Sequence, residues 1–133
     1  MTGPLTRTAY EAMIAEDIAW LDAQPHTLER EHVRAIVARS AVHEYSAARV
    51  VAAAVQTGDD LVTHSLPPPA RHHHVIRALG EADYPSEESW RQGFLLSDGT
   101  FATRREALLV ARAAGQVLRE TGPHIGLFSE DVW

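Results

Sequence analysis

The sequence predicts an α+β fold: a small antiparallel sheet of about four strands, helices packed mainly on one face, and an N-terminal helical hairpin. Two patterns support this. Apolar residues recur at three- and four-residue steps near the N-terminus, whereas short apolar runs separated by turn sequences follow in the middle of the chain. We expect residues 1–46 to form the accessory hairpin and residues 47–133 to form the main α+β domain.

The N-terminal hairpin is expected to contain two helices. The first covers residues 5–22 with Thr8 as its cap, and Gln24-Pro25-His26 ends it. Thr27 then caps a second helix that ends near Tyr45. Helices this short do not stabilise themselves, so we expect the pair to pack on the main domain or on a second copy of the chain.

Four strands are expected, in two hairpins. The first hairpin contains an alanine-rich run that would also suit a helix, and the second is joined by an Asp-Gly turn. The expected strands are 49–56 and 61–66 around a turn at 57–60, and 93–96 and 100–102 around Asp98-Gly99. Residues 81–91 are polar and are expected to form a surface loop.

Two further helices complete the prediction. One covers residues 71–79, follows three prolines and stops at Gly80. The other runs from Arg104 to about Arg119, buries Leu118 and ends at Gly122-Pro123. The last ten residues are aromatic and apolar, so we expect this tail to dock on the domain.

Composition restricts the function. A net charge of −6 argues against binding to polymeric nucleic acid, and the absence of cysteine excludes disulfides and thiolate metal sites. No apolar run has membrane-spanning length and no signal peptide is evident, so we expect a cytoplasmic protein that does not bind membranes. All twelve basic residues are arginine, which fits either a GC-rich genome or the binding of phosphate and carboxylate groups.

Two arginines occupy an unusual position. Thr103 and Glu106 form a predicted capping box, and Arg104 and Arg105 lie between them, in the first helical turn. Cations at a helix N-terminus oppose the helix dipole. Either both are solvated surface side chains, or an anion binds between them and the free N–H groups of the first turn. Arg71 repeats the arrangement at the start of another helix, and two such helix starts would suit a pyrophosphate.

The run His72-His73-His74 is the next candidate. Successive helical residues point in different directions, so at most two of the three can serve one site. Glu130 and Asp131 could complete a zinc site, but adjacent histidines on a helix chelate poorly, and we expect no metal. Hydrogen bonds from His72 and His74 to a ribose or phosphate are the preferred interpretation.

Four other residues are candidates for ligand contact. Phe94 and Phe101 are expected in the core, although an aromatic side chain could instead stack on a base. Gln92 precedes Gly93, a glycine that allows close approach of a ligand or of another backbone. Gln116 is expected to make a buried polar contact or to lie at the wet edge of its helix.

No catalytic motif is evident. The chain has no cysteine, no serine in a nucleophile elbow, no Walker-type phosphate loop and no dinucleotide fingerprint. We therefore expect no cofactor and no enzymatic activity.

Three segments carry a family resemblance. They are RHHHVIRAL (71–79), QGFLLSDGTFATRREALLVARAAGQV (92–117) and LFSEDVW (127–133), within a region of similarity covering roughly residues 49–133. Together they resemble the first-described family of phage Thoeris anti-defence proteins. The chain departs from the family pattern at Thr103, where an acidic or Asn cap is expected, and at Pro67–Ala70, where a glycine is expected.

The resemblance implies a function. Members of that family are sponges in the bacterial cytosol, which sequester cyclic ADP-ribose isomers without cleaving them and so block Thoeris immune signalling. Some members also hold cyclic oligonucleotides, and they form homo-oligomers from dimers to hexamers. The implied ligand contacts, in the domain formed by residues 47–133, are Arg71, His72, His74, Gln92, Phe94, Phe101, Arg104, Arg105, Gln116, Glu130 and Asp131.

Two alternatives stay open. The first is a nucleotide hydrolase or lyase that uses His72–His74 with Glu130 or Asp131. The second is a protein-interaction module whose working surface is the N-terminal hairpin.

Overall fold

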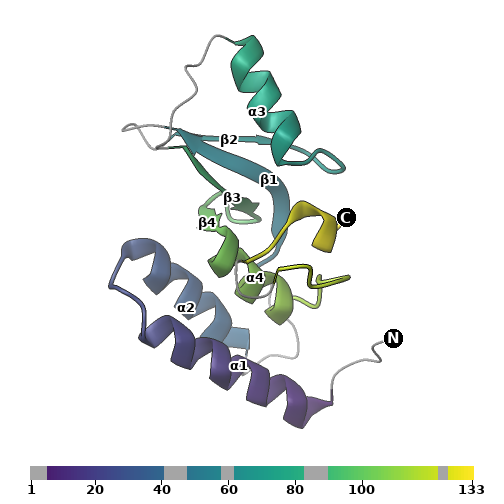
Figure 1. Cartoon of the computed structure of the whole chain (residues 1–133). Helices are drawn as coiled ribbons and strands as arrows, with labels where there is room; N and C mark the ends of the chain where they lie inside the picture. The colour runs from purple at the N-terminus through teal and green to yellow at the C-terminus, as the bar shows by residue number, and fades with distance from the viewer. Residues whose placement is uncertain (1–5, 41–47, 58–61, 83–89, 123–125) are drawn as a thin grey trace.

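The computed structural model describes residues 6–40, 48–57, 62–82, 90–122 and 126–133, and has the predicted α+β architecture (Figure 1). The end of the second helix near Tyr45, most of the turn at 57–60 and most of the loop at 81–91 lie outside the described residues. The elements are α1 Arg7–Asp22, α2 Leu28–Ser40, β1 Val50–Thr57, β2 Val62–Leu66, α3 His72–Glu81, β3 Arg91–Leu96, β4 Phe101–Thr103, α4 Arg104–Ala113 and a 3-10 helix, η1, Ser129–Asp131.

The sheet has the strand order β2-β1-β3-β4, and every strand pair is antiparallel. Ala53 of β1 lies between Leu66 of β2 and Phe94 of β3. All of β1 except Val51 is buried, which explains why its sequence is a continuous apolar run rather than an alternating one. The alanine-rich segment is therefore a central strand, as predicted, and not a helix.

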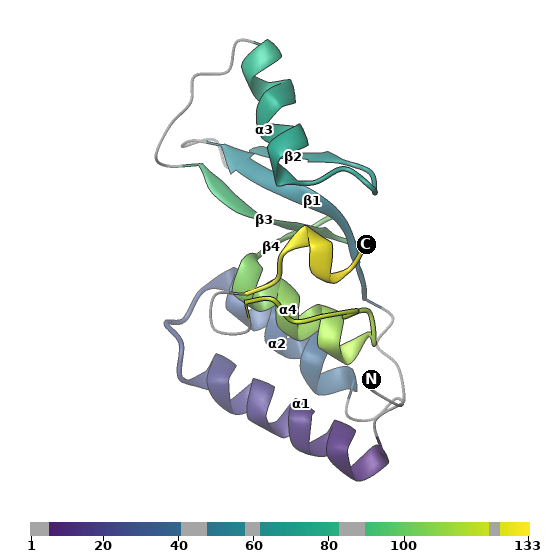
Figure 2. The same ribbon diagram turned by 45° about the vertical axis from the view of Figure 1, so that its right-hand side comes forward.

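Helices α3 and α4 cover the same face of the sheet. Residues two apart on a strand, and residues directly opposite on neighbouring strands, share a face, so Ala53, Val55 and Phe94 lie together. Val55 packs with Val75 and Leu79 of α3, whereas Ala53 and Phe94 belong to the cluster that includes α4. Figure 2 shows the C-terminal segment between these two helices.

The N-terminal helices stack on α4 at the end of the molecule opposite α3 (Figures 1 and 2). The hydroxyl of Tyr10 donates to the carbonyl oxygen of Ala113 at 2.9 Å, which ties α1 to the end of α4. All three helices contribute to one core cluster, with Ile14 and Leu21 from α1, Val33, Ile36 and Val37 from α2, and Leu108 and Ala111 from α4. The division into an accessory hairpin (1–46) and a ligand-binding domain (47–133) stays a prediction.

Two predicted helix boundaries, one in α1 and one in α3, are wrong. Thr6, not Thr8, caps α1, because its Oγ1 accepts a hydrogen bond from the Ala9 N–H at 3.1 Å. Gly80 does not end α3, which continues to Glu81. A glycine costs a helix only about 1 kcal/mol relative to alanine, and burial of Val75 and Leu79 stabilises this helix.

The last long helix is shorter than predicted. It ends at Ala113 rather than near Arg119, because the chain turns at Gly115 with a φ of +69°. Leu118 is 66% exposed, so its predicted burial is wrong. Its N–H donates to the carbonyl oxygen of Asp131 at 2.7 Å, and the stretch after α4 therefore contacts the C-terminal segment.

None of the helices in the described part of the chain combines the length and apolar character needed to cross a bilayer.

Asp17 is an unusual buried charge in α1. The residue is 5% exposed, and its Oδ1 lies 3.6 Å from Nη1 of Arg112 on α4. Its Oδ2 has no hydrogen-bond partner among the described residues. Burial raises the pKa of Asp17 to about 6, and the charge of Arg112 offsets part of that effect. The folded protein therefore holds this proton more tightly than the unfolded chain, which makes the ionised carboxylate destabilising above pH 6.

We expect Asp17→Asn to raise the free energy of unfolding by about 1–3 kcal/mol at pH 8, since one pKa unit corresponds to about 1.4 kcal/mol. The gain should vanish below about pH 4, where the carboxyl is protonated in both states. Urea denaturation at the two pH values measures both effects, with Glu81→Gln, at an exposed glutamate of α3 whose charge does not act on Asp17, as control. If Asp17→Asn instead makes the protein less stable at pH 8, the attraction between the Asp17 carboxylate and Arg112 stabilises the protein by more than burial of the charged carboxylate destabilises it.

Candidate functional site

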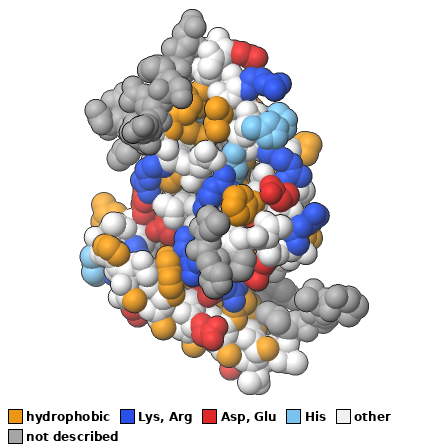
Figure 3. Space-filling model, in the orientation of Figure 1, with side chains coloured by type: hydrophobic (Ala, Val, Ile, Leu, Met, Phe, Trp, Pro, Cys, Tyr) orange, Lys and Arg blue, Asp and Glu red, His pale blue; other side chains and the backbone are white. Residues whose placement is uncertain are grey.

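Both helix starts that carry a candidate arginine contact the C-terminal segment. Arg71 lies directly before α3, Arg104 begins α4, and residues 127–133 lie between the two helices (Figure 2). Figure 3 shows basic, histidine and acidic side chains beside one another on this face, between α3 and the stacked helices. The predicted docking of the tail is confirmed, and the tail forms one wall of the candidate site.

Arg104 is half-buried and has only neutral partners. Its Nη1 donates to the carbonyl oxygen of Leu127 at 2.9 Å, and its Nη2 donates to Oε1 of Gln92 at 2.7 Å. Its guanidinium carbon lies 4.7 Å from the ring centre of Phe128. No carboxylate of the described residues lies within ion-pair distance, and burial lowers the pKa of Arg104. The carboxylates of Glu130 and Asp131 act on this cation without forming a direct ion pair with it. A half-buried cation without a direct ion pair is costly, so this position favours an incoming anion.

Arg71 supplies a second positive charge. Its Nη2 donates to the main-chain oxygen of Trp133 at 2.9 Å, and its Nη1 donates to the hydroxyl of Ser129 at 3.4 Å. Oε2 of Glu130 lies 3.6 Å from Nη1, in a long ion pair. The two arginines are therefore held in place largely by oxygens of one short segment.

The histidines of α3 have different environments. His72 is 6% exposed, and its Nε2 donates to the carbonyl oxygen of Gly93 at 2.6 Å. Its ring also meets the edge of Phe94 at 4.9 Å between ring centres. Burial lowers the pKa of His72 to about 4, although the bond to Gly93 partly opposes that shift. His72 is therefore neutral near pH 7 and attaches the start of α3 to β3.

His74 is exposed and forms part of the helix cap. Its Nδ1 accepts a hydrogen bond from the Arg71 N–H at 2.8 Å, and its ring lies 4.0 Å from that of His73. Within the described residues, no group of three or more histidines and acids is arranged to hold a metal ion.

Phe94 and Phe101 lie in the core, as expected from their strand positions. Phe94 is fully buried and packs edge-on against Trp133 as well as His72. Phe101 covers Gly93, where a Cβ would lie 2.6 Å from the Phe101 ring and 2.2 Å from the carbonyl oxygen of Ala102. The close approach predicted at this glycine is therefore made by the protein itself.

Gln116 and Asp131 support the backbone. Gln116 accepts from the Val50 N–H and donates to the Val50 carbonyl oxygen, both at 2.8 Å. The sequence suggested a buried polar contact on a helix, whereas this contact is part-buried and lies after the end of α4. Asp131 is 1% exposed, accepts from the N–H and hydroxyl of Thr121, and accepts from the Phe128 N–H. The ligand-binding roles predicted for both residues stay predictions.

Arg105 points to another part of the molecule. Its guanidinium carbon lies 4.7 Å from the ring centre of Trp20 on α1, so it contacts the N-terminal hairpin. The structure brings together Arg71, His72, Gln92, Arg104 and Glu130 around the tail, without Arg105.

The sequence did not single out the main-chain oxygens of Leu127 and Trp133, which hold the two arginines. Main-chain groups carry no residue-type signal, so only the aromatic character of the tail could have indicated their role.

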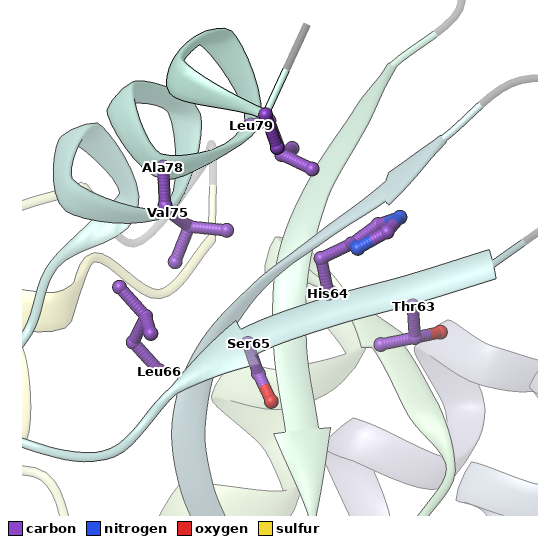
Figure 4. A pocket seen from close by; sticks show the side chains of 8 residues that line it. Thr63, His64, Ser65, Leu66, Val75, Ala78 and Leu79 are labelled. Carbon is purple, nitrogen blue, oxygen red and sulfur yellow. The ribbon is translucent and has the colours of Figure 1, made fainter. Parts of the chain in front are cut away.

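A separate groove of about 450 Å³ lies between α3 and the edge strand β2 (Figure 4). Val75 and Leu79 point into it from the helix, and His64 and Leu66 face them from the strand. The described residues that line this groove include no acid, arginine or lysine, so they offer nothing to a phosphate comparable with Arg71 and Arg104.

Comparison with known proteins links the main domain to one family. The model of a family described as phage T4 y16D protein matches residues 49–133, well over half of the chain. The match contains both arginines and the C-terminal segment, and it begins just before β1. No curated protein and no solved structure matches the chain.

We expect His72→Ala to lower the free energy of unfolding by about 1–3 kcal/mol at pH 7.5, because the Gly93 carbonyl loses its donor. His72→Gln, which keeps a donor, should lose less. In the wild type, stability is lost between pH 6.5 and 4 because His72 takes up its proton at a higher pH in the unfolded chain than in the folded protein. In both variants this loss of stability should be smaller.

Denaturation at several pH values measures these changes, and the exposed neighbour His73→Gln should stay within about 0.5 kcal/mol of the wild type at pH 7.5. An acid dependence that is unchanged in both His72 variants would contradict a neutral, buried His72.

Proposed function

The chain belongs to the phage T4 y16D protein family, and we propose that it binds a cyclic ADP-ribose-type nucleotide and holds it without cleaving it. In this proposal the protein is an anti-defence sponge, which removes the signal of Thoeris immunity in the host cytoplasm. The sequence resemblance to Thoeris anti-defence proteins supports the choice of ligand class, and the arginine pair supports the binding mode.

The observation that carries the proposal is the environment of Arg104. Its half-buried guanidinium is bound by a carbonyl oxygen, an amide oxygen and an aromatic ring, none of which neutralises its charge. A phosphate oxygen would supply that charge and form the stronger, charge-assisted hydrogen bond. Gln92 and the Leu127 carbonyl hold the guanidinium in position before a ligand arrives, which reduces the entropy lost on binding.

Arg71 extends the site to a second phosphate. It contacts the same segment, residues 127–133, as Arg104 does, and both sit at the N-terminal ends of helices. The two phosphates of a pyrophosphate can thus each meet one arginine and one helix start. In the proposed complex His74 and Gln92 are available to the ribose hydroxyls, and Phe128 offers an aromatic surface beside the adenine.

The contacts favour binding over catalysis. A hydrolase or lyase would need a histidine and an acid free to move protons. His72 uses Nε2 to hold Gly93, and both carboxylate oxygens of Asp131 are bound by Thr121 and Phe128. The interaction-module alternative is also less favoured, since α1 and α2 bury apolar side chains in the protein's own core.

Two further properties implied by the resemblance belong to the proposal. These are binding of cyclic oligonucleotides and assembly into dimers or hexamers. Titration with a cyclic trinucleotide and sedimentation velocity of the purified protein measure them directly.

We expect Arg104→Gln to weaken binding of a cyclic ADP-ribose isomer by at least about tenfold, because a charge-assisted hydrogen bond is lost. Arg105→Gln makes the same change of charge one residue away and should leave the affinity near that of the wild type. Arg104→Lys keeps the charge but not the fork geometry and should fall between them. Isothermal titration calorimetry measures all three, with circular dichroism to confirm folding.

The ligand recovered by heating the complex should be intact by chromatography. A converted product would favour the enzyme alternative. A wild-type protein that is folded and binds no isomer at micromolar concentrations would refute the sponge proposal.

A further inference from the structure

Glu130 is an exposed acid beside the two arginines of the candidate site. Its carboxylate lies 3.6 Å from Arg71, and its negative charge acts on both Arg104 and His72, raising the pKa of each against the larger effect of burial. Glu130 lies in η1, within the segment that both arginines contact.

We propose that Glu130 is a built-in counter-ion, which a phosphate-bearing ligand displaces and which makes the site select ligands with at least two negative charges. This inference rests on the proposed function, because it concerns the same site. It gives Glu130 a role opposite to the ligand contact that the family resemblance implies: the side chain competes with the ligand and does not bind it.

The ion pair is suited to displacement. The side chain of Arg71 is 34% exposed and that of Glu130 is 49% exposed, and the atoms are 3.6 Å apart. Pairs of this kind are weak, since water screens them and two flexible side chains must be ordered. A ligand phosphate can therefore replace the carboxylate at small cost.

The backbone around Glu130 can stay in place during the exchange. Its neighbours Ser129 and Asp131 are 3% and 1% exposed, and Asp131 is held by Thr121 and Phe128. Only the Glu130 side chain, which is exposed to solvent, needs to rotate away. The wall that holds Arg71 and Arg104 is then unchanged by ligand binding.

Charge balance explains the selectivity. Before binding, the site holds the cations Arg71 and Arg104 and the displaceable anion Glu130, while the low pKa of His72 keeps that residue neutral. The carboxylate of Asp131 also acts on Arg104, but Thr121 and Phe128 hold it in place, so its charge is the same before and after binding. A ligand with one negative charge would do no more than replace Glu130. A pyrophosphate would neutralise Arg71 and Arg104 together, which gives it the larger gain.

The test uses Glu130→Gln with two probes, inorganic pyrophosphate and a cyclic ADP-ribose isomer, in isothermal titration calorimetry. We expect both probes to bind about two- to fivefold more tightly than to the wild type. The gain should shrink at high salt, where charges are screened. Glu130→Asp keeps the charge and should resemble the wild type. Glu120→Gln, at an exposed glutamate that lies 3.8 Å from Arg112, is the matched control and should change neither affinity.

The outcomes separate this inference from the proposed function. Weaker binding of the nucleotide to the Glu130→Gln variant, with pyrophosphate unaffected, would make Glu130 a ribose ligand and overturn the inference alone. Unchanged affinity for both probes would also overturn it alone. If the wild-type protein binds neither probe, the anion site itself fails, and both proposals fail with it.

Discussion

Leu127 donates its N–H to the carbonyl oxygen of Arg104 at 2.8 Å, and its own carbonyl oxygen accepts from the Arg104 guanidinium at 2.9 Å. This reciprocal contact joins the start of α4 to the C-terminal segment. The approach is so close that a Cβ at Gly126 would lie 2.5 Å from the Arg104 carbonyl carbon, and Gly126 has a φ of +129°. The position of the tail, and through it the positions of Arg71, Ser129 and Glu130, depends on this junction.

Local rules were enough to predict most of the elements. Thr103 and Glu106 do form a capping box, and Asp98-Gly99 does turn β3 into β4. Rules of the same kind failed where distant contacts decide the outcome. Gly80 lies inside α3 because that helix packs on β1, and the chain after Gly115 leaves the helix to meet Asp131.

The candidate site was predictable by residue type but not by arrangement. Arginines at the start of a helix oppose the helix dipole, and this rule identified Arg71 and Arg104 as candidate anion ligands. Both side chains contact the C-terminal segment in the structure. The same rule could not separate Arg104 from Arg105, since adjacent helical positions differ by about 100° in direction. It also could not show that His72 would use its Nε2 within the fold, because the partner is the main-chain oxygen of Gly93.

The joining of residue 71 to residue 133 also has a consequence for synthesis. Arg71 and Arg104 leave the ribosome before the segment that fixes them, and contacts between residues so far apart in sequence form late in folding. A nascent chain that stops short of residue 127 would carry both arginines yet have no assembled site. Under the proposed function, ligand capture would begin only once the tail has emerged and docked. Loss of the tail would also uncover the core of the sheet, since Leu127 lies in that core and Trp133 packs on Phe94.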